Sequence, residues 1–136
     1  MVTPALEKKD WRRPIYVQVV RRASGEVLLP SARWCASRLC RLRGLQFRRR
    51  LNAGEGLILV KSSDSVVNSS IHMWFVFYPI AAVWISGEGR VTSAQLARPW
   101  RPYYASPAPA RYVLEASPDF LERIAVGDEL DFVRQR

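Results

Sequence analysis

The longest apolar run of this sequence is IHMWFVFYPIAAVWI, residues 71–85. A membrane-spanning helix needs about 20 apolar residues, so this run, which His72 and Pro79 interrupt, is too short to span a membrane. Its β-branched and aromatic residues are typical of buried strands. We therefore expect two short strands, Ile71–Phe77 and Ala81–Ile85, and no membrane span.

Strand patterns recur on both sides of this run. Glycines within residues 86–89 predict a hairpin turn, and Ser24-Gly25 predicts another. Pro14 suits the edge of a first strand. The further expected strands are Ile15–Val20, Glu26–Leu29, Leu57–Lys61, Arg90–Leu96, Tyr112–Ala116 and Glu129–Val133.

Two helices are expected as well. Ser31 is a favourable N-cap for a helix that reaches about Leu42, and Ser117 with Pro118 favours a second one that ends near Ala125. The sequence thus predicts an α+β fold dominated by antiparallel sheet. We expect a compact curled sheet or small barrel with about two short helices.

The 136 residues fit a single domain, 1–136, in which residues 1–12 form an N-terminal extension. Those first residues lack the apolar stretch of a secretory signal. Cys35 and Cys40 fall within the first expected helix, where their side chains would point in different directions, so we expect free thiols. Together these features predict a cytoplasmic location.

The net charge of +9 lies in the first 50 residues, which hold 13 basic and three acidic side chains. Residues 51–136 hold eight basic and nine acidic ones. Such a basic stretch suits nucleic acid or another polyanion, although arginines on a solvated loop give the same pattern. The predicted anion or nucleic-acid patch consists of Arg38, Arg41, Arg43, Arg48, Arg49 and Arg50.

Four motifs, in order, resemble one family. They are RGLQFRRRL at 43–51 with GEGL at 54–57, IHMWF at 71–75 with YPI at 78–80, ARYVLE at 110–115, and GD at 127–128. Over residues 15–133 the chain is similar to the bacterial and archaeal domain of unknown function 192. The resemblance implies a compact, mostly β domain with no agreed activity and no known cofactor.

The chain departs from the family pattern at several positions. Ala81 stands where the family usually has an aspartate, and Gln46 where it favours methionine. Val76 and Phe77 also differ from the common residues. The resemblance therefore implies a divergent member, which has lost any role that the aspartate has in its relatives.

Catalytic signatures are weak. His72 is the only histidine and lies in an apolar stretch, which favours a structural role over a general base. The two cysteines lack zinc-ligand spacing, so no metal or other cofactor is expected. Glu115 and Asp128 could form a carboxylate pair. The alternative gives Glu115 an arginine partner and lets Asp128 cap a turn.

Polar side chains at or near the motif positions could converge on one cleft. We expect a non-enzymatic module that binds a small ligand or anion there. Two alternatives stay open. One is nucleic-acid binding through the basic N-terminal third, with Trp100, Tyr103 and Tyr104 stacking on bases, and the other is a small hydrolase or transferase that has lost its acid at Ala81. The candidate cleft consists of Arg48, His72, Arg101, Tyr104, Arg111 and Glu115.

Overall fold

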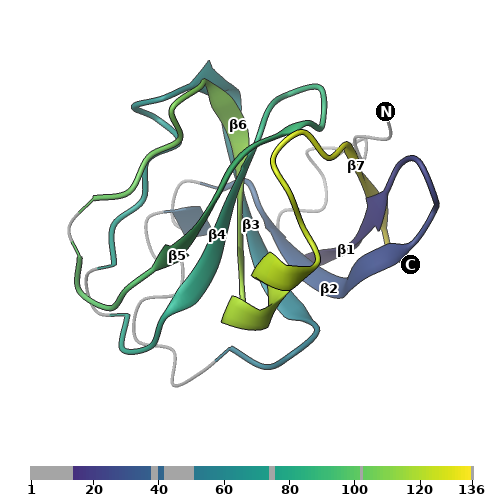
Figure 1. The fold of residues 1–136 in the computed structure, drawn as a ribbon, viewed down its shortest axis with the longest axis horizontal. Helices are drawn as coiled ribbons and strands as arrows, with labels where there is room; N and C mark the ends of the chain where they lie inside the picture. The colour runs from purple at the N-terminus through teal and green to yellow at the C-terminus, as the bar shows by residue number, and fades with distance from the viewer. Residues whose placement is uncertain (1–13, 38–39, 42–50, 74–75, 102, 136) are drawn as a thin grey trace.

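A computed structural model describes residues 14–37, 40–41, 51–73, 76–101 and 103–135, and seven strands form one curled sheet (Figure 1). The spatial order is β5-β4-β6-β3-β2-β1-β7. Every neighbouring pair is antiparallel except β2 and β3, which run parallel. The elements are β1 (Ile15–Arg21), β2 (Val27–Cys35), β3 (Glu55–Ser65), β4 (Ile80–Ile85), β5 (Val91–Ala97), β6 (Ala110–Ala116), the 3-10 helix η2 (Pro118–Glu122) and β7 (Leu130–Arg134).

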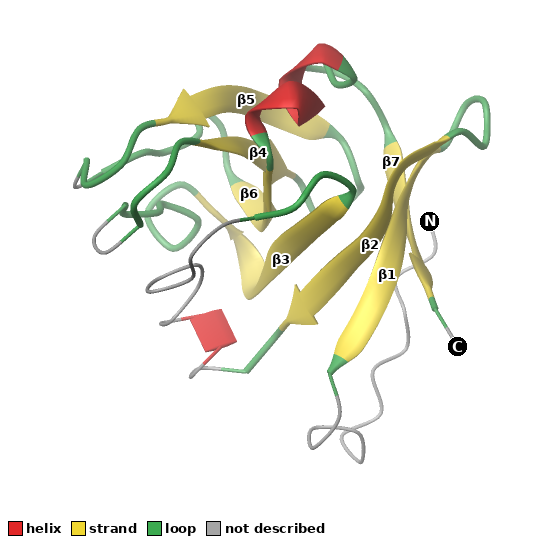
Figure 2. Ribbon diagram, turned by 90° about the horizontal axis from the view of Figure 1, so that it is seen from below, coloured by secondary structure: helices red, strands yellow, loops and turns green. Residues whose placement is uncertain are grey.

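The sheet curls far enough to bring its two edge strands together at one end (Figure 2). The Val91 amide donates to the Asp128 carbonyl at 2.8 Å, and the Leu130 amide donates to the Gly89 carbonyl at 2.8 Å. The architecture is therefore a half-barrel whose edges β5 and β7 meet where both begin. This confirms the predicted mostly β, curled sheet.

Each face of the sheet carries its own apolar cluster, because side chains alternate along a strand. The inner cluster draws on all seven strands and is covered by η2 through Phe120. The outer cluster includes Leu57 and Leu59 of β3, Trp84 of β4 and Val113 of β6. It also takes in side chains from the loops, so the outer face is partly covered by irregular chain.

The helix expected from Ser31 to Leu42 is wrong over its first part, because β2 continues to Cys35. Ala32 and Trp34 are buried on the inner face while Arg33 between them is exposed, which is the alternation of a strand. Of the rest, Cys40 and Arg41 are helical and residues 38–39 and 42 lie outside the described residues.

Two further expectations need correction. In the described part of 71–77, Ile71 forms an isolated bridge with Tyr104 instead of a strand. The second helix is only the five-residue 3-10 turn η2. The prediction of about two short helices is therefore wrong, because the apolar surface is buried by strands and loops.

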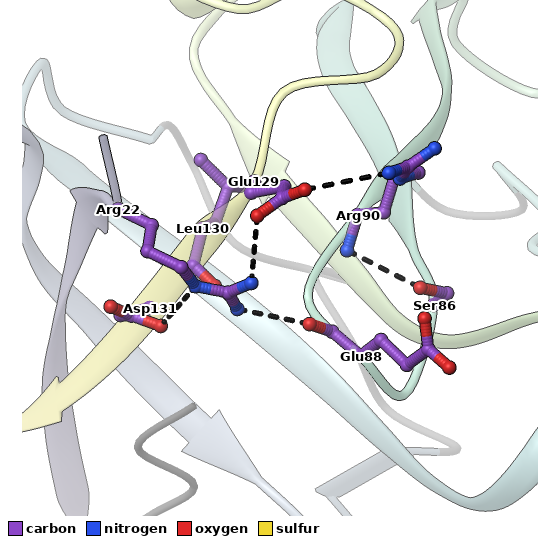
Figure 3. A network of polar contacts seen from close by, with 7 residues as sticks. All are labelled: Arg22, Ser86, Glu88, Arg90, Glu129, Leu130 and Asp131. Atoms are coloured by element: carbon purple, nitrogen blue, oxygen red, sulfur yellow. Dashed lines mark hydrogen bonds and ion pairs between the residues drawn. The ribbon is translucent and has the colours of Figure 1, made fainter.

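Arg22 joins the first strand to the last (Figure 3). Its Nε donates to Asp131 at 3.0 Å and its Nη1 to Glu129 at 3.0 Å, while Nη2 donates to the carbonyls of Glu88 and Leu130. The hydrogen bond to Asp131 is the main reason that the pKa of Arg22 lies above its usual value. Arg22 thus fastens the joint between the two sheet edges.

Gly89 lies at the same joint with φ of 92°, and a Cβ there would stand 2.5 Å from the Leu130 carbonyl oxygen. We expect Gly89→Ala to lower the free energy of unfolding by about 2 kcal/mol, through backbone strain and crowding. Urea titration measures this. Gly25→Ala is the control: its φ is 74°, but nothing lies within 4 Å of the added Cβ. Equal losses in both variants would contradict the role given to crowding at the joint.

Candidate functional site

The connection from β2 to β3 is a crossover, and its described ends lie against the outer face. Parallel neighbours require such a crossover, because the chain must return to the starting end of the sheet. Cys40 and Leu51, near the two ends of the connection, both pack against the outer cluster. The family-like motif at 43–51 belongs to this crossover, although residues 42–50 lie outside the described part.

A disulfide joins Cys35 at the end of β2 to Cys40 in the crossover, with their Cα atoms 5.5 Å apart. The expectation of free thiols is therefore wrong. It assumed that one helix held both residues, whereas the chain leaves β2 after Cys35 and turns back. The cytoplasmic prediction loses that support and stays a prediction.

The crossover places Arg41 beside β3. Ser37 Oγ accepts a hydrogen bond from the Cys40 amide at 3.2 Å, which fixes the start of the helical turn. Arg41 Nη1 donates to the Val60 carbonyl at 3.0 Å, one residue past the last β2–β3 pair at Leu59. The Arg41 side chain thus binds the β3 backbone at the point where its parallel pairing with β2 ends.

Two more cations gather at this point. Arg111 of β6 donates from Nε to the Lys61 carbonyl at 3.1 Å. Lys61 is half-buried, and desolvation first, then the charge of Arg41, lowers its pKa, while the charge of Glu115 opposes this. Arg41, Lys61 and Arg111 together form what we call the basic triad.

Glu115 is a buried carboxyl group on the outer side of β6, with 5% of its surface exposed. Its cross-strand neighbours are Leu57 and Ala82, both apolar. Burial raises the pKa of Glu115 to about 7, and the charge of Lys61 opposes the shift. Oε2 has no hydrogen-bond partner among the described residues. The expected arginine partner is not among them either.

The structure describes five of the six candidate cleft residues, since Arg48 lies outside the described part. Tyr104 is buried in the outer cluster and its hydroxyl accepts from the Arg98 amide at 2.9 Å. Arg111 and Glu115 alternate with Tyr112 and Leu114 and so share that face. His72 and Arg101 are exposed, and the Arg101 guanidinium lies 5.8 Å from the centre of the Tyr104 ring.

The basic patch is mostly outside the described residues. Arg41 is its one described member, while Arg38, Arg43 and Arg48–Arg50 are not described. Lys61 was missed as a site residue, although a charged residue that ends the apolar segment GLILV was a usable signal. Asp128 does cap a turn, because its Oδ2 accepts from the Ala125 amide at 2.9 Å.

Ala81, where the resemblance implies an aspartate in other members, faces the inner cluster. Its cross-strand neighbours are Ala116 and Leu96, whereas Glu115 lies opposite Ala82. The two motif positions therefore point to opposite faces of the sheet. A carboxylate pair between them would not form in this register.

A family model described as an uncharacterized ACR, domain of unknown function 192, matches residues 19–132. The chain belongs to this family. A UPF0127 protein of Thermococcus sibiricus is 26% identical over 116 residues, which cover 84% of this chain and 73% of that protein. One from Pyrococcus furiosus is 27% identical over 112 residues, covering 81% and 93%.

Two solved structures share the fold of this domain of unknown function 192 protein. A proposed transcription regulator from Sinorhizobium meliloti has a TM-score of 0.75 at 20% identity, covering 88% of this chain and 94% of that one. A protein of unknown function from Novosphingobium aromaticivorans has a TM-score of 0.74 at 20% identity, covering 96% and 93%. At this identity the likeness concerns the fold alone.

The described residues of this family member contain no helix that is both long and apolar enough to cross a membrane. Within the same residues, no three or more histidine, cysteine, aspartate or glutamate side chains are grouped to hold a metal ion.

Proposed function

We propose that this chain is a non-enzymatic binding module that holds a small anion at the basic triad, beside Glu115. The observation that carries the proposal is that Arg41 and Arg111 bind the carbonyls of two consecutive residues of β3, Val60 and Lys61, and that the charge of Arg41 acts on the Lys61 ammonium group. A guanidinium group has five N–H donors, and each arginine spends one of its nitrogens on the backbone there. The pKa of Lys61 is lowered first by desolvation and then by the charge of Arg41, and the negative charge of a bound anion would oppose both effects.

Glu115 makes the binding depend on pH. Below its pKa of about 7 the carboxyl group is neutral and can donate a hydrogen bond to an anion oxygen. Above it, the carboxylate repels an anion. The affinity therefore falls as the pH rises through about 7.

Sulfate is a suitable probe, because its charge does not change over the pH range of interest. We expect wild-type protein to bind sulfate more tightly at about pH 6 than at about pH 8.5, and Lys61→Met to weaken binding about tenfold at pH 6 through loss of a charged contact. Isothermal titration calorimetry measures both. Methionine keeps most of the apolar length of the half-buried lysine stem.

Arg90→Met is the matched control, since Arg90 is exposed and its guanidinium group already pairs with Glu129. It should bind sulfate as the wild type does. Glu115→Gln should remove the pH dependence while keeping a hydrogen-bond donor. Equal sulfate affinity of wild type and Lys61→Met, or no wild-type binding at millimolar sulfate, would reject the proposed site.

The basic N-terminal third has less free charge than its composition indicates. Arg21 pairs with Asp128 at 2.8 Å and Arg22 with Asp131 at 3.0 Å, so the fold uses both charges internally. Nucleic-acid binding through this third therefore rests on Arg33, Arg41 and the basic residues outside the described part. The hydrolase or transferase alternative gains no support here, because the side chains of Ala81 and Glu115 point to opposite faces of the sheet.

A further inference from the structure

Two segments that flank β4 and β5 in the sequence pair with each other beside the outer cluster. Ile71 and Tyr104 exchange both backbone hydrogen bonds at 2.9 Å, and the Met73 amide donates to the Arg101 carbonyl at 2.9 Å. Ile71, Met73 and Tyr104 are buried in the outer cluster. His72 and Tyr103, which alternate with these residues along the two segments, are exposed.

Three large aromatic side chains are exposed on this pair of segments. Phe77, Trp100 and Tyr103 expose 56%, 43% and 57% of their surface. The rings of Phe77 and Trp100 contact each other edge to face, with centroids 5.5 Å apart. Such concentrated exposed aromatic surface marks an interaction site on a domain of this size. We call these three residues the aromatic patch.

The backbone holds Trp100 in an unusual conformation. Its φ is 63°, which residues other than glycine seldom adopt. The Trp100 amide donates to the Met73 carbonyl at 2.9 Å, and this bond keeps the conformation in place. Strained positions of this kind concentrate at functional sites, because the surrounding structure must maintain them.

The surroundings of the aromatic patch are cationic. Arg98 and Arg101 are exposed on either side of Trp100 along the chain. Residues 71–79 and 97–104 contain no acidic residue. Exposed rings combined with guanidinium groups, on segments that carry no acidic residue, suit a ligand that offers both flat rings and negative charge.

We propose that the aromatic patch binds single-stranded nucleic acid, with bases stacked on Trp100 and Tyr103 and phosphates paired with Arg98 and Arg101. A peptide strand is less suited, because the backbone groups of Ile71, Met73 and Tyr104 already bind across the pair. The ligand is then recognised by the faces of the aromatic rings and by the guanidinium groups. The aromatic patch shares no residue with the basic triad, so each of the two proposals can be tested independently of the other.

The test uses a fluorescein-labelled oligothymidylate of about 12 nucleotides, a length within the usual range for such sites. Fluorescence anisotropy at low salt measures its affinity for the full chain. We expect Trp100→Ala and Tyr103→Ala each to weaken binding about tenfold, the usual effect of losing one stacked base. A duplex of the same length should bind more weakly, because its bases are not open to stacking.

Tyr16→Ala is the matched control, because Tyr16 is also exposed, at 42%, but lies on β1. It should bind as the wild type does. In Arg98→Gln/Arg101→Gln, the slope of log affinity against log salt should become shallower by about 1.4, since each phosphate contact on a single strand contributes about 0.7.

Tyr103 is more than half exposed, so its removal leaves the fold intact even if Trp100→Ala disturbs the strained backbone; thermal unfolding checks both variants. Wild-type affinity in Tyr103→Ala would overturn the proposal, as would absence of oligonucleotide binding at low salt. An acidic peptide that binds as tightly and with the same sensitivity to Tyr103→Ala would assign the patch to a protein partner instead.

Discussion

Glu115→Gln is expected to raise the free energy of unfolding at about pH 8.5 by about 3 kcal/mol, and to leave it almost unchanged at about pH 4. The physical reason is the burial of the carboxyl group between Leu57 and Ala82, which raises its pKa from 4.5 to about 7. Glutamine has nearly the same shape and carries no charge. It therefore removes the cost of keeping an ionised group in the interior.

The sign follows from proton binding. Between pH 4.5 and about 7 the folded chain keeps the proton on Glu115 while the unfolded chain releases it. The stability of the wild type therefore falls as the pH rises across this window, by about 1.4 kcal/mol per pH unit, and then stays level. The glutamine variant lacks this decline.

Urea titrations at several pH values measure the difference between the two proteins. Glu122→Gln is the control, because Glu122 is exposed on η2 and should leave the pH profile of stability unchanged. Parallel stability profiles for wild type and Glu115→Gln from about pH 4 to 8.5 would show that burial does not perturb this carboxyl group.

Trp84→Ala is expected to lower the free energy of unfolding by about 4 kcal/mol. Trp84 is fully buried in the outer cluster, and its Nε1 donates to the Ser69 carbonyl at 2.8 Å. The substitution leaves a cavity and an unpaired carbonyl together. Trp84 thus attaches the loop before residue 71 to β4.

Trp84→Phe separates these contributions, because it keeps most of the apolar volume and loses the hydrogen bond. Its cost should be clearly smaller, about 2 kcal/mol. Chemical denaturation followed by circular dichroism gives both values. A loss below about 1 kcal/mol for Trp84→Ala would mean that the outer cluster contributes little to stability.

Much of the sheet could be predicted because burial follows the residue pattern. The apolar residues of LILV at 57–60 and AAVWI at 81–85 are buried in strands, as expected. The segment 31–35 could not be assigned correctly, since Ser31 suits a helix N-cap and Arg33 suits a helix surface. Residues 31–35 form a strand because they pair with residues 55–59, and the local sequence does not show a pairing between such distant segments.

The site was predictable only in part. The motif at 110–115 singled out Arg111 and Glu115, which the structure places on the same face. The neighbours that bury Glu115 come from β3 and β4, so no local pattern shows its raised pKa. The disulfide was missed because the helix that we wrongly expected over residues 31–42 would have held the two sulfur atoms apart.

The meeting of β5 and β7 also bears on self-association. An open sheet exposes unpaired backbone groups at its edges, where another molecule can add a strand. Here the edges bind each other where both strands begin. Farther along β5, Gln95 donates to the Ala105 carbonyl at 2.9 Å, so the segment at 105–106 shields that edge. In the described part of the chain, the five-residue β7 is the edge that remains for pairing between molecules.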